Sequence, residues 1–180
     1  MSEQTVLRLG TVRNISQFQE HLRSRNLSIP CDERILVGQD SPLRAVIHDA
    51  QFDIGNRIAV QPMEGWDGTL DGNPTESTIR RWRRFGRSGA KLIWGGEAVA
   101  VTPEGRANPN QLLISPHTEK GLGQLRTALI EEHRLAAGSD RGLLVGLQLT
   151  HSGRFCRPHD TRAEPRIVGK YHAAALTAQS

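Results

Sequence analysis

The chain has 180 residues, which is enough for one ordinary domain with a hydrophobic core and too few for two. Apolar residues make up 37% and aromatic residues 4%, so the chain is polar for its size without having the composition of a disordered protein. The net charge of +4 is distributed along the chain, which indicates a solvated surface and not a specific acidic partner.

Cysteine usage and hydropathy argue against a disulfide-linked secreted protein and against a membrane-spanning one. Cys31 and Cys156 lie far apart in unrelated contexts, so no disulfide framework is indicated and a reducing compartment fits best. The N-terminus lacks the basic-then-apolar pattern of a secretory signal, and no apolar run approaches the ~20 residues needed to cross a bilayer. We therefore expect a soluble, cytoplasmic protein that does not contact a membrane.

Residues 1–54 are predicted to form a leader of mixed structure without recognisable chemistry. Ser16 and Gln19 have the spacing of a capping box, which predicts a short helix reaching about Arg25. Pro30 and Pro42 then break the chain into extended pieces.

A regular alternation of apolar strands and amphipathic helices begins near residue 55. Residues 58–60 form the first predicted strand, and a helix follows with Asn73 as its cap, Pro74 at its first position and Gly86 and Gly89 closing it. The next strand covers residues 92–94 and leads into a glycine-rich end at residues 95–98.

A second helix is predicted from about Thr118 to Ala137, ended by Gly138, and a third strand over residues 143–149. Apolar strands separated by helices indicate a parallel sheet covered by helices, either open or closed into a barrel. Polar residues gather where the strands end, as they do in (β/α) barrels, and this favours the barrel.

The third strand delivers Gln148, His151 and Arg154 to its carboxyl end within a few residues. An amide, an imidazole and a guanidinium at one strand end could form a site, or could only hydrogen-bond loop carbonyls. Taken alone, this group favours neither interpretation.

Three segments of the chain form a recognisable set of motifs. The first covers residues 56–63 and ends in Pro62 and Met63; the second covers residues 86–93 with Glu97, Ala98, Gly105 and Arg106; the third covers residues 148–154. Together they resemble the first three barrel strands, in that order, of the Old Yellow Enzyme family of flavin-dependent oxidoreductases. The resemblance covers about residues 55 to 166, in the expected order and spacing.

The resemblance implies an α/β fold in which residues 55–180 form the first part, about three strand–helix units, of an FMN-binding (β/α)8 TIM barrel. It also implies that NAD(P)H reduces the flavin, which then passes a hydride to an activated alkene or a related small unsaturated substrate. The implied flavin contacts are Gln61, Pro62, Met63, Glu64, Ala98 and Gln148, with His151 and Arg154 nearby.

Glu64 departs from the family pattern, because a small or neutral hydrogen-bonding side chain is more usual there. An ionised carboxylate ~6 Å from a reduced, anionic flavin would repel it by ~3 kcal/mol at an effective dielectric of ~20, which is roughly 60 mV for a two-electron couple. Glu64 is therefore expected to be protonated, to be turned away, or to lower the flavin potential.

The number of strand–helix units is a second departure, because the complete barrel needs eight. The residues that would activate the substrate and bind the flavin phosphate are not found in this sequence, so the catalytic residues are unknown. We therefore expect a fragment that lacks turnover. The alternative is a non-catalytic α/β binding or interaction module that needs a partner to complete its sheet.

Two further patterns have simpler explanations. A run of arginines could bind nucleic acid, but a solvated helix face explains it better, and we expect no nucleic-acid partner. This run comprises Arg80, Arg81, Arg83, Arg84 and Arg87. His151, Cys156 and His159 have ligand-like spacing, yet a structural metal site needs four ligands, so we expect no metal.

Overall fold

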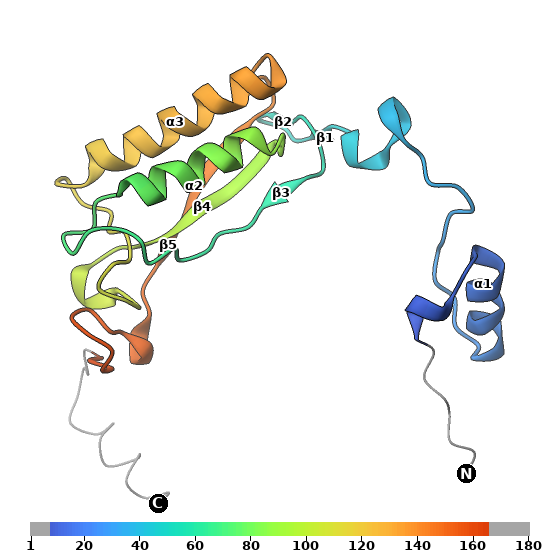
Figure 1. The fold of residues 1–180 in the computed structure, drawn as a ribbon, viewed down its shortest axis with the longest axis horizontal. Helices are drawn as coiled ribbons and strands as arrows, with labels where there is room; N and C mark the ends of the chain where they lie inside the picture. Colours follow the sequence, from blue (N-terminus) through green and yellow to red (C-terminus); the bar gives the residue numbers. More distant parts are fainter. Residues whose placement is uncertain (1–7, 166–180) are drawn as a thin grey trace, which may run out of the picture. The chain divides into compact units, whose positions relative to one another are not determined.

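The structure is a computed structural model that describes residues 8–165 (Figure 1). The chain divides into two compact units, residues 1–41 and residues 42–180. The predicted boundary after residue 54 stays a prediction, and residues 166–180 of the predicted barrel domain lie outside the described residues.

The first unit contains the short 3-10 helices η1 (Leu9–Thr11) and η2 (Gly38–Asp40) and the helix α1 (Ile15–Ser24). Asn14 caps α1, because its side-chain oxygen accepts a hydrogen bond of 2.9 Å from the Gln17 N–H. The predicted capping box at Ser16 and Gln19 is therefore wrong: Ser16 already lies inside the first turn, and the stronger cap precedes it. The predicted end is confirmed, since Arg25 is the C-cap.

The second unit begins with η3 (Pro42–Arg44) and a small antiparallel hairpin of β1 (Ile47–His48) and β2 (Asp53–Ile54). Ile54 is buried, and the Gly55 N–H donates to the Gly142 carbonyl at 2.9 Å, just before the third parallel strand. The hairpin is thereby tied to the amino-terminal end of the main sheet.

The main sheet has three parallel strands in the order β3 (Ala59–Val60), β4 (Leu92–Ala100) and β5 (Leu144–Thr150). The predicted parallel arrangement is confirmed. β4 is longer than expected, because an irregularity between Trp94 and Ala98 keeps the glycine-rich segment within the strand. Gly95 lies there at φ 65°, a backbone conformation that glycine adopts without a steric penalty.

Two helices connect these strands, α2 (Glu76–Arg87) and α3 (Glu119–Ala137). The cap of α2 is Thr75, which forms a reciprocal capping box with Thr78. The predicted cap Asn73 is wrong, because its side chain instead donates to Asp71 at 3.0 Å. Gly138 ends α3 as predicted, in a left-handed conformation at φ 74°.

Both helices lie side by side on one face of the sheet (Figure 1), and the core fills the space between them and the strands. The fully buried side chains there include Trp82, Ile93, Leu125 and Leu129. Gly89 follows the C-cap Ser88 of α2 at φ 76°, as expected of a residue that closes a helix, whereas Gly86 lies inside the last turn, where a Cβ atom would clash with the Leu129 carbonyl oxygen of α3. Burial of each large side chain stabilises the fold by about 1.5–3 kcal/mol.

Among residues 8–165, no helix is long and apolar enough to cross a membrane. The cytoplasmic location stays a prediction. Elements β3, α2, β4, α3 and β5 confirm the predicted alternation, while the closed eight-stranded barrel stays a prediction.

Candidate functional site

The carboxyl ends of the three parallel strands bring the predicted site segments together at one edge of the sheet. Ala98 is paired in register with Gln148, and the Ala98 N–H donates to the Met63 carbonyl at 3.2 Å. A Cβ atom on Gly95 would lie 3.0 Å from Pro62 Cβ and 2.6 Å from the Gln148 nitrogen. Only glycine allows the three segments to approach this closely.

The side chains at this edge differ in exposure. Met63 is 71% exposed and Gln148 is also exposed, whereas Ala98 is only 3% exposed beneath them. Gln61 is exposed, and Pro62 is half-buried. The predicted residues are therefore neighbours, and their contact with a flavin stays a prediction.

A buried ion cluster lies beneath the loop that carries Met63 and Glu64. The fully buried Glu97 accepts a hydrogen bond from the Gly65 N–H at 2.6 Å through Oε1, and it pairs with Arg81 Nη2 at 2.7 Å through Oε2. Arg81 Nη2 also pairs with Asp67 Oδ1 at 2.8 Å. One guanidinium thus joins the loop, helix α2 and strand β4.

The electrostatics of the cluster follow from this burial. Desolvation raises the pKa of Glu97 above its ordinary value, although the Gly65 N–H and Arg81 both act in the opposite direction. Burial alone would lower the pKa of Arg81, but the hydrogen bonds and charges of Asp67 and Glu97 outweigh it, and the pKa of Arg81 is raised.

Sequence reasoning missed this cluster and placed Arg81 on a solvated helix face, which is wrong. Arg81 is half-buried, whereas Arg80, Arg83 and Arg84 are exposed. Its position three residues after the buried Thr78 puts it beside the buried side of α2, and that spacing was the available signal.

The loop above the cluster has an unusual backbone. Trp66 lies at φ 50°, a left-handed conformation that costs a non-glycine residue of order 1–3 kcal/mol. Its neighbours Gly65 and Asp67 are the residues that Glu97 and Arg81 hold. Trp66 Nε1 also donates to Glu64 Oε2 at 2.9 Å, which ties the Glu64 carboxylate to its own loop. The three expectations for Glu64 stay predictions.

His151 and Arg154 lie just beyond the end of β5, and both are exposed. His151 Nδ1 accepts from the Gly153 N–H at 3.1 Å, and the Arg154 guanidinium lies 4.7 Å from the centre of the Phe155 ring. These contacts are local to the loop. They leave both side chains at the mouth of the strand, as predicted, without joining them to Gln148.

Two buried polar side chains outside the set of predicted flavin contacts hold the surrounding loops. Gln111 donates to the Ala98 carbonyl and to Thr150 Oγ1, both at 3.0 Å, and so links β4 to β5. Arg106, 8% exposed, donates through Nη1 to the Leu70 and Pro109 carbonyls at 2.8 Å. Gln111 and Arg106 therefore act as supports beneath the strand ends.

The two other patterns in the sequence concern a metal site near Cys156 and the arginine-rich helix α2. Within residues 8–165, no group of three His, Cys, Asp or Glu side chains could hold a metal ion. Cys156 is buried, and desolvation raises the pKa of its thiol. On the arginine-rich helix, Arg87 pairs with Glu132 of α3 at 2.6 Å, so part of that positive charge is already compensated.

Three solved structures, one of them an Old Yellow Enzyme homologue, are similar to this chain. The homologue from Zymomonas mobilis is 27% identical with a TM-score of 0.50, over 62% of this chain and 28% of that one. 2-Naphthoyl-CoA reductase is 19% identical with a TM-score of 0.54, over 66% of this chain and 17% of that one. Morphinone reductase in complex with tetrahydroNAD is 22% identical with a TM-score of 0.50, over 63% and 28%. No family model and no curated protein matches the sequence.

The parallel sheet covered by helices defines an α/β protein. Within that class the chain resembles the Old Yellow Enzyme homologue from Zymomonas mobilis, and the resemblance predicted from the strand-end motifs is confirmed. The chain spans 28% of the Zymomonas mobilis homologue and 17% of 2-naphthoyl-CoA reductase, so the activity of the whole protein is a proposal.

Proposed function

We propose that this protein is an FMN-dependent oxidoreductase that uses NAD(P)H to reduce an activated alkene or a related small molecule. The observation that carries the proposal is the meeting of Met63, Ala98 and Gln148 at one edge of a parallel sheet. The 27% identity to an Old Yellow Enzyme homologue supports the same interpretation.

The chemistry of these side chains fits a flavin. The exposed Gln148 carboxamide makes no side-chain hydrogen bond within residues 8–165, so its donor and acceptor atoms are available for the polar edge of a flavin ring. Pro62 and Met63 offer apolar surface for the ring itself, and the small Ala98 leaves room beside them. Bound FMN would supply the hydride transfer.

The face of the sheet opposite the helices supports the barrel that this function requires. Along β4, Ile93 is fully buried against the helices, while its neighbour Trp94 is 55% exposed. Successive side chains of a strand point to opposite faces, so Trp94 lies on the face without helices. A large apolar side chain there is typical of a barrel interior.

Flavin binding by the purified chain tests the proposal. We expect FMN to co-elute with the protein and its fluorescence to change on titration. Gln148→Ala should weaken binding, whereas Gln124→Ala on the exposed side of α3 should not. Absence of bound flavin in the folded protein would contradict the proposal. NAD(P)H oxidation would further show turnover.

The alternative, a non-catalytic module that completes its sheet with a partner, is favoured by one observation. Among residues 8–165, β5 pairs only with β4, so its other edge is open. A protein of this kind would bind no flavin, and the titration distinguishes the two functions.

A further inference from the structure

Two consecutive residues of β4 hold the loop that follows β3, one on each side of Glu64. The Ala98 N–H donates to the Met63 carbonyl at 3.2 Å, and Glu97 Oε1 accepts from the Gly65 N–H at 2.6 Å. Glu97 is fully buried, which shields its bond to Gly65 from water. The peptide groups before and after Glu64 are therefore both fixed by β4.

The far end of the same loop is held by helix α2 and its cap. Asp67 Oδ1 pairs with Arg81 Nη2 at 2.8 Å, and the Asp67 carbonyl accepts from Thr75 Oγ1 at 2.6 Å. Trp66, at φ 50°, lies between the two fixed residues Gly65 and Asp67. The left-handed backbone of Trp66 is therefore enforced from both sides.

Gly65 lies directly against the guanidinium that joins these contacts. A Cβ atom at Gly65 would overlap Arg81 Nη2, the atom that pairs with Glu97 at 2.7 Å and with Asp67 at 2.8 Å. A shift of Arg81 away from the loop would break one of these two pairs. The path of the loop therefore depends on glycine at position 65 and on the two carboxylates that hold Arg81.

A buried ion cluster is a costly way to stabilise a fold, because apolar side chains of similar volume often stabilise it as well or better. Such a cluster does fix one geometry, since each charged group must keep its partners. A binding site gains from this support, because a loop that is ordered in advance loses less conformational freedom when the ligand binds.

We propose that Glu97 is a positioning residue for the flavin site. Through Gly65 and Arg81, it holds the loop of residues 63–67 in the conformation that binds the flavin ring. Glu97 lies beneath that loop and acts on the flavin only through these partners. The inference rests on the proposed function, and it uses only contacts among residues 63–98, so it is compatible with the barrel that this function requires.

Glu97→Gln is the variant that tests the proposal. It keeps the size of the side chain but has one acceptor oxygen where two are needed, so either Gly65 or Arg81 loses its partner. FMN affinity should fall about 10-fold or more, the factor that corresponds to one hydrogen bond to a charged group. The visible circular dichroism of the bound flavin should also change. A residue that only stabilised the fold would lower the thermal midpoint and leave both readouts unchanged below it.

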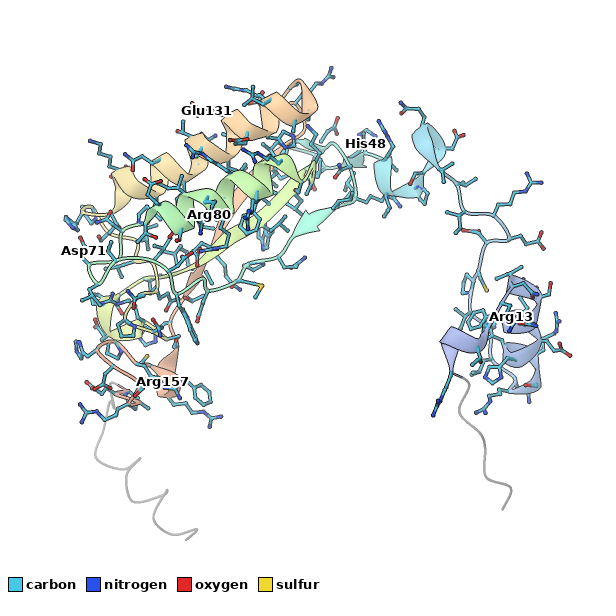
Figure 2. All side chains as sticks on the ribbon, viewed as in Figure 1. Arg13, His48, Asp71, Arg80, Glu131 and Arg157 are labelled. Atoms are coloured by element: carbon cyan, nitrogen blue, oxygen red, sulfur yellow. The ribbon has the colours of Figure 1, made fainter. Side chains whose placement is uncertain are left out.

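Two neighbouring glutamates of α3 provide matched controls. Glu132 pairs at 2.6 Å with Arg87 in the last turn of α2, the end away from the loop, so Glu132→Gln also removes a carboxylate from an α2 arginine. Glu131 is exposed and labelled in Figure 2, and Glu131→Gln controls for the loss of one negative charge. Both variants should bind FMN with the affinity of the wild type.

Hydrogen exchange in the flavin-free chain tests the support without the cofactor. The Gly65 amide should exchange faster in Glu97→Gln than in the wild type, and at the wild-type rate in Glu132→Gln. If Glu97→Gln does not fold, Asp67→Asn takes its place, because it loosens the other end of the loop and leaves Glu97 paired with Arg81. FMN affinity should fall in that variant too, and an unchanged affinity would count equally against the proposal.

The outcomes separate this inference from the proposed function. A wild-type chain that binds no FMN overturns the proposed function, and with it this role of Glu97. If the wild type binds FMN and Glu97→Gln binds it equally well and with the same dichroism, the role of Glu97 alone is overturned, whatever the loss of stability.

Discussion

Glu97 Oε2 of β4 lies 2.7 Å from Arg81 Nη2 of α2, and this ion pair supports the loop that follows β3. The other carboxylate oxygen of Glu97 accepts from the Gly65 N–H, and Arg81 also holds Asp67. Because Glu97 is fully buried, its charge depends on these partners. The conformation of the loop that carries Met63 and Glu64 therefore depends on a buried ion pair. This pair holds the loop at the Gly65 N–H and at Asp67, and not at the side chains of the predicted flavin contacts.

Replacing Arg81 with methionine should destabilise the protein strongly. The substitution leaves the buried Glu97 carboxylate without its counter-charge, and removal of one partner of a buried pair costs about 3 kcal/mol or more. The measurement is the free energy of unfolding from urea titration. Arg80→Met, at an exposed position on the same helix, is the matched control and should leave the transition nearly unchanged.

The left-handed backbone at Trp66 predicts a difference between two small substitutions. Both Trp66→Gly and Trp66→Ala remove the indole and its hydrogen bond to Glu64, but only glycine adopts φ 50° without a steric cost. The glycine variant should therefore be more stable than the alanine variant by about 1 kcal/mol. Equal stabilities, or a more stable alanine variant, would show that the loop does not hold this conformation.

Stability should fall on mild acidification because of His133. This residue is fully buried; its Nδ1 lies 3.0 Å from the Gly86 carbonyl and its Nε2 2.8 Å from Lys91 Nζ, so the neutral ring donates at one nitrogen and accepts at the other. Burial lowers the pKa of His133 below its ordinary value of 6.5.

The unfolded chain consequently binds a proton at His133 before the folded chain does. The contribution of His133 to stability is fully present above about pH 6.5, and it is lost as the pH falls below that value. Urea titrations between about pH 7.5 and pH 5 should show this decline, and His133→Gln should reduce it. A pH-independent difference between the two proteins would contradict a neutral, buried His133.

Two glycines in the helices should respond to alanine in opposite directions. At Gly86 a Cβ atom would clash with the Leu129 carbonyl oxygen, so Gly86→Ala should cost about 1–3 kcal/mol through overpacking of α2 against α3. At Gly123 a Cβ atom would meet nothing within 4 Å, so Gly123→Ala should stabilise the protein by about 0.5–1 kcal/mol. Thermal unfolding of both variants at low protein concentration provides the comparison.

For the flavin-loaded protein, Glu64→Gln tests the role of the unusual carboxylate. If Glu64 is ionised ~6 Å from the reduced ring, its removal should raise the midpoint potential by roughly 60 mV. Spectroelectrochemical titration measures this directly, with Glu76→Gln in the first turn of α2 as the control. An unchanged potential would mean that Glu64 is protonated or turned away from the flavin.

The sequence by itself determined the alternation of elements and the approximate position of each site segment. Apolar runs of strand length, amphipathic periodicity and the glycine after α3 are local signals, and local signals predict element type well. The order of the strand ends then brought Met63, Ala98 and Gln148 to one edge, because parallel strands share a direction.

Only the tertiary structure decided which polar residues hold that edge together. The caps at Asn14 and Thr75 replaced the expected ones, since the chain path before each helix selects among several suitable side chains. Arg81 and Glu97 lie on different elements, and Gln111 joins β4 to β5 from a loop. Such pairings depend on distances between segments far apart in the chain, which composition and periodicity do not encode.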